Sequence, residues 1–240
     1  MTSILARLCF FMVVLCHVPL LQAIDNPLKP FNAEYVVEQD QEIVARTHIS
    51  LKRIGDNRWR YRSDSVPTGW LATMLGVEVA QESEWTWNDH IVTHRFRYDR
   101  GGKEKHVHLI FDWEQMKVTN VINGDPWQMK ILPGTQDKFS INLALMAHLS
   151  QSETDISFPV ADGGKLKTYD FKVLGKEIIN TALGQLNTIK VSRNKRGRTG
   201  RQATLWLSPE LGYLLVKMEK ADKDEEIATM SIQAVNQTGK

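Results

Sequence analysis

Apolar and polar residues alternate along most of the chain with a period of two, the pattern of strands that bury one face. Phe31, Ala33, Tyr35 and Val37 are the first such set. Further strands are predicted at residues 43–54, 58–66, 91–113 (a hairpin), 115–123, 127–132, 168–178, 186–193, 202–207, 213–220 and 226–235. Their number and spacing predict an all-β fold, mostly antiparallel, closed or half-closed into a barrel-like sheet.

One stretch, residues 137–149, predicts a helix instead. Asp137 is a suitable N-cap, since its carboxylate can accept hydrogen bonds from the first free backbone N–H groups. The apolar side chains that follow leave little polar surface: Phe139, Ile141, Leu143, Leu145, Met146 and Leu149. We therefore expect a largely buried helix that plugs or covers the sheet.

Residues 67–76 also interrupt the alternation. Trp70 and Met74 are spaced for one side of a short helix, and Gly69 and Gly76 bound the apolar stretch. Because a curved sheet with an apolar inner face could enclose a ligand, we expect this segment to act as a lid. Trp70 and Met74 are accordingly candidate ligand-binding residues.

The N-terminus has the layout of a secretory signal peptide. Arg7 precedes an apolar run at residues 8–21, and Ala23 stands before a polar stretch with prolines. We predict cleavage after Ala23 and a periplasmic location. An uncleaved anchor and a lipoprotein modified at Cys16 are the alternatives. The expected organisation is a signal peptide at 1–23, a short leader at 24–30 and a single β-rich domain at 31–236.

Composition removes several classes of function. Both cysteines, Cys9 and Cys16, lie in the signal peptide, so thiol catalysis and thiolate metal sites are not expected in the mature chain. The 30 Lys and Arg residues nearly balance the 28 Asp and Glu, which argues against a nucleic-acid partner. No later stretch is long and apolar enough for a transmembrane span, so none is expected in the mature form.

The hairpin at residues 91–113 carries a strongly polar face. A two-residue turn at Gly101-Gly102 predicts that Asp99 lies opposite Glu104. In the same register Arg97 lies opposite His106, and Arg95 opposite His108. Arg95, Arg97, His106 and His108 would then form a cluster of donors suited to an anionic head group. The alternative is the solvated outer face of a sheet.

Other chemistry is weakly indicated. His106 and His108 have the spacing of two metal ligands, but arginines face them in the predicted register, so no metal is predicted. The chain lacks the Gly-x-Ser-x-Gly and His-Glu-x-x-His motifs, and no catalytic residue or cofactor is predicted. The basic run at residues 194–201 could contact an anionic surface or simply form a solvated loop. The aromatic pairs Trp59 with Tyr61 and Trp85 with Trp87 could line a pocket or fill a core.

Several short motifs are similar to those of a bacterial family of exported proteins, domain of unknown function 3108. They are Phe31-x-Ala33-x-Tyr35, Pro67-x-Gly69, Glu82-Ser83, Phe111-Asp112-Trp113, Pro133-Gly134-x-x-Asp137, Leu183-Gly184-x-Leu186-x-Thr188 and Leu205-Trp206-x-Ser208-Pro209. The resemblance spans roughly residues 31–232. It implies an all-β, barrel-like envelope protein of Gram-negative bacteria, and no activity, cofactor or catalytic residue.

The sequence thus leads to three hypotheses. The first is an envelope protein that binds an apolar or amphiphilic ligand, such as a lipid, inside the barrel. The second is a structural or interaction component with a filled core and an envelope protein as its partner. The third is a hydrolase of an envelope polymer, for which no catalytic group is apparent.

Overall fold

The computed structural model describes residues 26–69, 78–101, 105–195, 203–221 and 227–237. Its strands form a single sheet in the order β8-β7-β6-β5-β4-β3-β2-β1-β15-β14-β13-β12-β11-β10-β9. The first eight strands are β1 (Phe31–Gln39), β2 (Glu42–Gly55), β3 (Arg58–Pro67), β4 (Val79–Trp87), β5 (Ile91–Arg100), β6 (Lys105–Asp112), β7 (Lys117–Ile122) and β8 (Asp125–Lys130). The remaining strands are β9 (Gln136–Asp137), β10 (Asp155–Asp162), β11 (Lys165–Thr181), β12 (Gly184–Lys195), β13 (Ala203–Ser208), β14 (Leu214–Ala221) and β15 (Ile227–Gln237).

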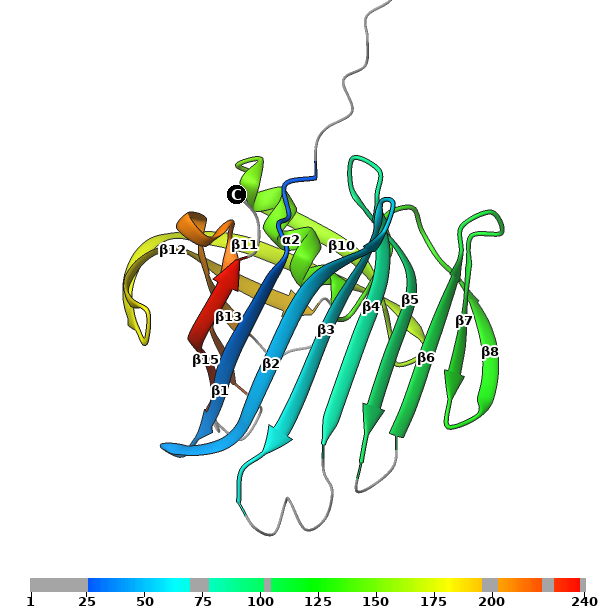
Figure 1. The fold of residues 1–240 in the computed structure, drawn as a ribbon. Coiled ribbons are helices and arrows are strands. Elements are labelled where there is room, and N and C mark those ends of the chain that lie inside the picture. The colour runs from blue at the N-terminus through cyan, green and yellow to red at the C-terminus, as the bar shows by residue number, and fades with distance from the viewer. Residues whose placement is uncertain (1–25, 70–77, 102–104, 196–202, 222–226, 238–240) are drawn as a thin grey trace, which may run out of the picture.

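The sheet is antiparallel throughout except where β9 pairs with β10. It curls around a helix, α2 (Ser140–Ser150), so that β10 and β11 pass behind the helix and β1 to β6 lie in front of it (Figure 1). β1 pairs with β15 and with β2, which joins the two halves of the chain in the middle of the sheet. The predicted all-β, barrel-like fold is therefore confirmed.

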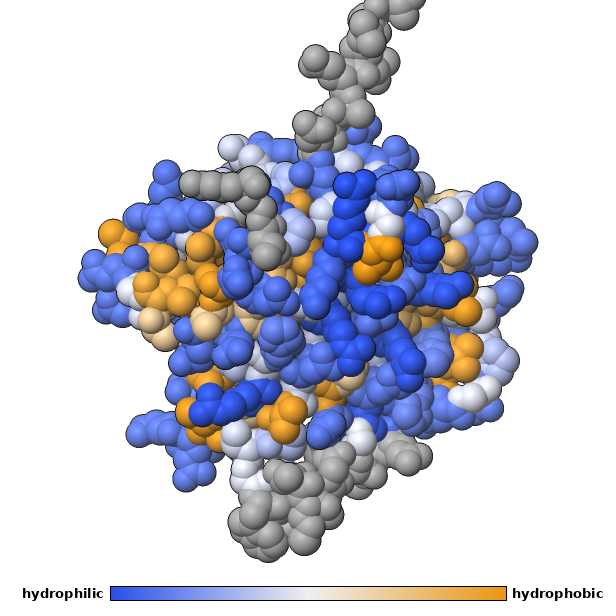
Figure 2. Space-filling view, viewed as in Figure 1, coloured by the Kyte–Doolittle hydropathy of each residue, from blue (hydrophilic) through white to orange (hydrophobic). Residues whose placement is uncertain are grey.

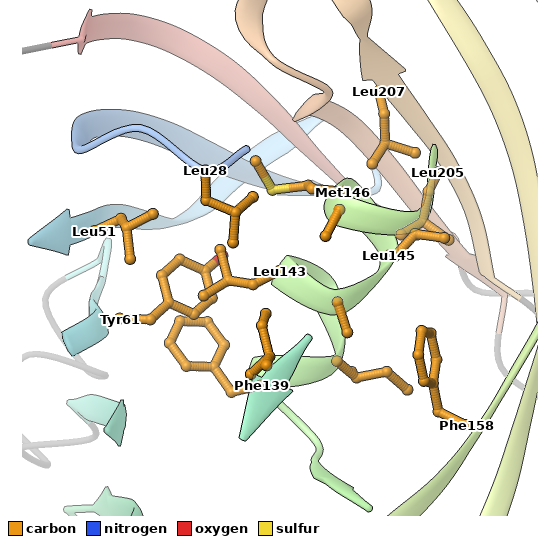
Figure 3. Close-up of a cluster of buried hydrophobic side chains, with 14 of the residues drawn as sticks. Leu28, Leu51, Tyr61, Phe139, Leu143, Leu145, Met146, Phe158, Leu205 and Leu207 are labelled. Atoms are coloured by element: carbon orange, nitrogen blue, oxygen red, sulfur yellow. The ribbon is translucent and has the colours of Figure 1, made fainter. Parts of the chain in front are cut away.

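The predicted buried helix is also confirmed, starting three residues later than expected. Asp137 Oδ1 accepts hydrogen bonds from the backbone N–H groups of Phe139 (2.6 Å) and Ser140 (2.8 Å), as expected of a capping side chain. Leu143 and Leu145 are completely buried. Figure 3 shows them between side chains of β2 and β3 on one side and β10 and β13 on the other. The helix thus occupies the interior of the rolled sheet.

Aromatic rings account for much of this core. Tyr61 stacks on Phe139 with ring centroids 3.9 Å apart, and Trp59 stacks on Trp85 at 5.5 Å. Trp85 is only 1% exposed. Such stacked pairs add stabilisation of about 0.5–1.5 kcal/mol each beyond their burial. Most of the aromatic residues that could have lined a pocket therefore belong to the filled core.

The sequence did not predict β10. Pro159 lies inside it, and proline disfavours a strand because it has no N–H to donate. The structure accommodates Pro159 because β9 pairs only with Val160 and Ala161, so β10 is otherwise an open edge at this position. β11 and β12 are also longer than predicted and extend as an arm beyond the sheet (Figure 1).

The predicted register of the β5–β6 hairpin is wrong by two residues. Asp99 lies opposite His106 rather than Glu104, and Arg97 lies opposite His108 rather than His106. Arg95 lies opposite Ile110. A shift of two residues leaves every side chain on its predicted face, because the side-chain period of a strand is also two. It also replaces the predicted like-charge pair with an acid facing a histidine.

Candidate functional site

The four predicted anion-binding residues on the β5–β6 hairpin lie on the outer, convex face of the sheet. Arg95, Arg97, His106 and His108 are all exposed, whereas the opposite face carries the buried Phe96 and Leu109. A band of hydrophilic side chains crosses this face in the space-filling view (Figure 2). These residues therefore do not point into the barrel.

Neighbouring acids already engage part of this cluster. Asp99 accepts hydrogen bonds from Arg97 Nε and from His106 Nδ1, the latter at 2.7 Å. Partial burial raises the pKa of Asp99, but these hydrogen bonds outweigh it and hold that pKa below its ordinary value. Further along β4, Glu84 binds Arg58 (3.2 Å) and Arg60 (2.9 Å). Ion pairs of this kind are typical of a solvated sheet face.

A bulge adds His94 to this face. Strand alternation alone would put His94 on the face opposite Arg95, but the β4–β5 register shifts between Glu84 and Trp85, and His94 hydrogen bonds Thr86 at 2.9 Å on the outer face. Desolvation and the charge of Arg58 lower the pKa of His94. Within the described residues no three His, Cys, Asp or Glu side chains are grouped to hold a metal ion.

The remaining predicted ligand-binding residues, Trp70 and Met74, lie outside the described residues, as does most of the basic run at 194–201. The predicted lid at 67–76 is described only at residues 67–69. The same holds for the predicted signal peptide, since the description begins at residue 26.

A cleft of about 300 Å³ opens at the rim of the barrel, beside the C-terminal half of α2. We call it the rim cleft. Its walls come from four segments far apart in the sequence. They are Trp87, Asp89, His90 and Ile91 at the β4–β5 turn, Pro133, Gly134 and Gln136 before the helix, Ala144, Ala147, His148 and Gln151 on the helix side, and Ser157, Phe158 and Pro159 on β10. The sequence named Trp87 as a possible pocket or core aromatic and Pro133-Gly134 only as part of a family motif; it did not bring these residues together.

The rim cleft combines an apolar floor with polar groups in fixed positions. The ring of His148 meets Phe158 edge-on, with centroids 5.1 Å apart, and its Nδ1 pairs with Glu153 Oε2 at 2.7 Å. Gln136 Nε2 donates to the carbonyl oxygen of Ile91 at 3.0 Å, which fixes the amide at the base of the cleft. Clefts of this composition, apolar with a few placed polar groups, are typical of small-molecule sites.

A buried polar network holds the wall of the rim cleft in place. Ser140 Oγ lies 3.0 Å from Gln136 Oε1 and 3.1 Å from Thr93 Oγ1, and Ser83 Oγ donates to Asp137 Oδ1 at 3.0 Å. All five residues are at most 2% exposed. This network ties β4 and β5 to the start of the helix, so the base of the cleft is rigid.

Asp137 is the ionisable member of that network. Complete burial raises its pKa, and the hydrogen bonds from Ser140, Phe139 and Ser83 only partly offset this. Its second oxygen, Oδ2, has no hydrogen-bond partner in the described part of the chain. The environment therefore favours the neutral carboxyl group more than water would.

The hydroxyl and imidazole groups near the rim cleft have partners of their own. Ser157, the hydroxyl residue on the β10 wall, donates to Asp170 at 2.9 Å, and His148 Nδ1 pairs with Glu153. The Thr86–His94 pair lies on the open outer face rather than in a cleft. Nucleophilic catalysis requires a hydroxyl paired with a base inside a substrate site, and we find no such pair among the described residues.

A second group of ionisable residues lies on the inner face of the barrel, at the end that carries the β10–β11 turn. Asp162 Oδ2 accepts hydrogen bonds from Lys167 Nζ (2.8 Å) and from the Tyr169 hydroxyl (3.0 Å). Burial, together with the charge of Asp162, raises the pKa of Tyr169 to about 12. Lys138 and Arg193 flank this pair, and we call the five residues the interior cluster.

The described fold and sites define a class: a β-sheet protein whose barrel-like sheet is rolled around one buried helix, with a ligand-sized cleft at its rim. The chain belongs to the family described as protein of unknown function (DUF3108), whose model matches residues 32–233. The resemblance drawn from the short motifs is thereby confirmed.

One solved structure supports the fold alone. The chain is similar to a β-barrel-like protein of domain of unknown function DUF1849 from Brucella abortus, at 11% identity and a TM-score of 0.57, with 89% of this chain and 99% of that one covered. A candidate lipoprotein from Parabacteroides distasonis aligns at 10% identity and a TM-score of 0.39, over 88% and 96% of the two chains. No curated protein matches the sequence. Across the described residues, no helix is both long and apolar enough to cross a membrane.

Proposed function

We propose that this protein is an exported binding protein of the cell envelope that holds a small amphiphilic ligand in the rim cleft. The observation that carries this proposal is the cleft itself, which places an apolar floor beside His148 and Gln136. Its volume of about 300 Å³ is at the lower end of ligand pockets. This suits one ring or a short chain better than a whole membrane lipid.

The position of α2 moves the ligand away from the centre of the barrel, where the sequence suggested it would lie. Leu143 and Leu145 have no exposed surface, so an apolar ligand would have to displace the helix to enter there. Protein cores are packed too densely for that without a large cost. The rim cleft, in contrast, is open to solvent and needs no such rearrangement.

The test is to fill the cleft with one side chain. Ala147 lines it, so Ala147→Trp should abolish binding of an uncharged fluorescent probe, N-phenyl-1-naphthylamine, that the unmodified protein binds. Ala182→Trp is the matched control, because Ala182 is exposed in the β11–β12 turn. Equal probe binding by both variants, with equal melting temperatures, would remove the rim cleft from the model. Native mass spectrometry of protein purified from the periplasm would then identify any natural ligand by its mass.

The filled core favours the second candidate function, a protein-interaction component of the envelope. The β11–β12 arm exposes Leu174 (53%) and Ile178 (66%), which are large apolar side chains for a solvated strand. The double substitution of Leu174 and Ile178 by Asp should reduce recovery of a partner from envelope extract under this hypothesis. Unchanged recovery, together with probe binding in the cleft, would favour the binding protein.

A further inference from the structure

The lining of the rim cleft is sorted by depth. Gln136 is the one polar residue in its buried part, and the other buried lining residues are Trp87, Ile91, Ala144, Ala147 and Phe158. The exposed lining residues, apart from Pro133, are polar, and they are Asp89, His90, Gln151 and Ser157. A ligand that matches this gradient buries an apolar part on the floor of the cleft and keeps a polar group at its mouth.

The amide of Gln136 leaves no hydrogen-bonding position for a ligand at the floor. Its Nε2 donates to the carbonyl oxygens of Ile91 (3.0 Å) and Gly134 (3.1 Å). Its Oε1 accepts from the hydroxyl groups of Ser140 (3.0 Å) and Thr93 (3.1 Å). Since a glutamine amide has two N–H donors and two acceptor lone pairs, the protein uses all four positions. A polar ligand group buried there would lose its hydrogen bonds to water without replacement.

Asp89 supplies the charge at the mouth. It is the only Asp, Glu, Lys or Arg among the described residues that line the cleft. A second carboxylate, that of Glu153, lies beside the helix wall, where it pairs with His148 Nδ1 at 2.7 Å and is 43% exposed. An anionic ligand group would be repelled by Asp89 and would meet no lysine or arginine in the described lining, whereas a cation would be attracted.

The tight β4–β5 turn holds Asp89 directly above the floor. Trp87 and Ile91 are paired across the two strands, and both belong to the buried lining. Asp89 lies at the tip of the turn that joins them, with a φ of 55°. Asparagine tolerates this left-handed conformation as well as aspartate does, so the carboxylate can be replaced by an amide without straining the turn.

Building on the binding role proposed for the rim cleft, we propose that its ligand is an organic cation, an amine carried on an apolar ring. The ring lies on the floor beside Trp87 and Phe158, and the protonated amine binds the carboxylate of Asp89 at the mouth. Gln151 and Ser157 line the same mouth, and their side-chain oxygens can accept further N–H groups of the amine. A cleft of about 300 Å³ has room for one such ring system.

Three probes that share a naphthalene ring test the charge of the ligand. At neutral pH 1-naphthylmethylamine is a cation, 1-naphthalenemethanol is uncharged and 1-naphthaleneacetic acid is an anion. In isothermal titration calorimetry we expect the amine to bind about fivefold more tightly than the alcohol, as for an ion pair at a partly exposed site. The acid should bind more weakly than the alcohol. In Asp89→Asn the amine should lose its advantage and bind no more tightly than the alcohol.

Asp40→Asn is the matched control. Asp40 is exposed in the β1–β2 turn, at the opposite end of the strands from the β4–β5 turn, and its φ of 52° is also in the left-handed region. The same change of charge on the same backbone conformation should therefore leave the preference for the amine intact. Circular dichroism verifies that each variant is folded.

The outcomes separate the charge of the ligand from the existence of the site. Amine binding no tighter than alcohol binding overturns the proposal, as does acid binding as tight as that of the amine, or an equal loss of preference in Asp40→Asn. If the alcohol still binds in these cases and Ala147→Trp abolishes that binding, the rim cleft remains the site and only the cationic ligand is excluded. If no probe binds, or if binding survives Ala147→Trp, the binding role of the cleft fails and this proposal fails with it.

Discussion

The indole ring of Trp127 lies over the backbone of Gly164, in the space that a Cβ atom at that position would occupy. Trp127 belongs to β8, the last strand at one end of the sheet, and Gly164 to the turn between β10 and β11 near the other end. The two ends of the rolled sheet thus meet through a ring packed on a glycine rather than through a hydrogen-bonded strand pair.

This contact predicts that one methyl group added at Gly164 lowers the free energy of unfolding. In Gly164→Ala the added Cβ would overlap the Trp127 ring, so one of the two sheet ends must move. Gly124→Ala is a suitable control, because Gly124 also has a positive φ but has no atom within 4 Å of a Cβ. Strain alone costs about 1 kcal/mol at either position, and overpacking should add roughly 1–3 kcal/mol only at Gly164. If urea unfolding shows that Gly164→Ala and Gly124→Ala lose the same free energy of unfolding, the two sheet ends are free to separate.

The helix inside the barrel should contribute strongly to stability. Leu143→Ala removes a completely buried side chain and is expected to lower the free energy of unfolding by about 2–5 kcal/mol, because the rigid surroundings leave a cavity. Leu174→Ala, at a side chain that is 53% exposed, should change it by less than about 0.5 kcal/mol. Similar small effects in both variants, measured by urea unfolding, would mean that the interior can collapse around α2.

Asp137 should make the protein less stable as the pH rises. Burial raises the folded-state pKa of Asp137 above the ordinary value of 3.8. Between these two values the folded state holds a proton that the unfolded state has released, so the free energy of unfolding falls with increasing pH in that window. Asp137→Asn cannot titrate, and its stability relative to the unmodified protein should therefore improve from about pH 4 upward.

Asp99→Asn provides the opposite case for the same experiment. The folded-state pKa of Asp99 is lowered below the ordinary value of 3.8. Asp99 therefore adds to the free energy of unfolding above pH 3.8, and this stabilisation is lost as the pH falls through the folded-state pKa. Urea unfolding at several pH values checks both variants. Parallel stability curves for Asp137→Asn and the unmodified protein would contradict the assigned effect of burial.

The charged outer face should contribute little to stability. Arg97 pairs with Asp99, but its side chain is 63% exposed, so Arg97→Ala is expected to cost no more than about 0.2–1 kcal/mol, and less at high salt. Arg95 has no ion-pair partner among the described residues, and Arg95→Ala should have no measurable effect. A loss that persists in about 1 M salt, compared by thermal melting, would show that this face has a structural role beyond its charges.

Much of the architecture follows from local patterns in the sequence. The alternation of Phe96 and Leu109 with Arg97 and His108 assigns a buried and a solvated face to the hairpin whatever its register, because successive side chains of a strand point to opposite sides. The apolar stretch after Asp137 likewise predicts a buried helix. These features depend only on residues close together in the chain, and the structure confirms them.

The tertiary structure decided the register, the interior and the sites. Gly101-Gly102 suggested a two-residue turn, but in the structure each β5 residue pairs with the β6 residue two positions later than predicted. A bulge in the β4–β5 pairing turns His94 outward. The rim cleft depends on Trp87, His148 and Phe158, which only the rolling of the sheet around α2 brings together. Lys138 approaches Asp162 for the same reason. No local pattern encodes such contacts, because they form between strands that are far apart in the sequence and meet only when the sheet rolls up.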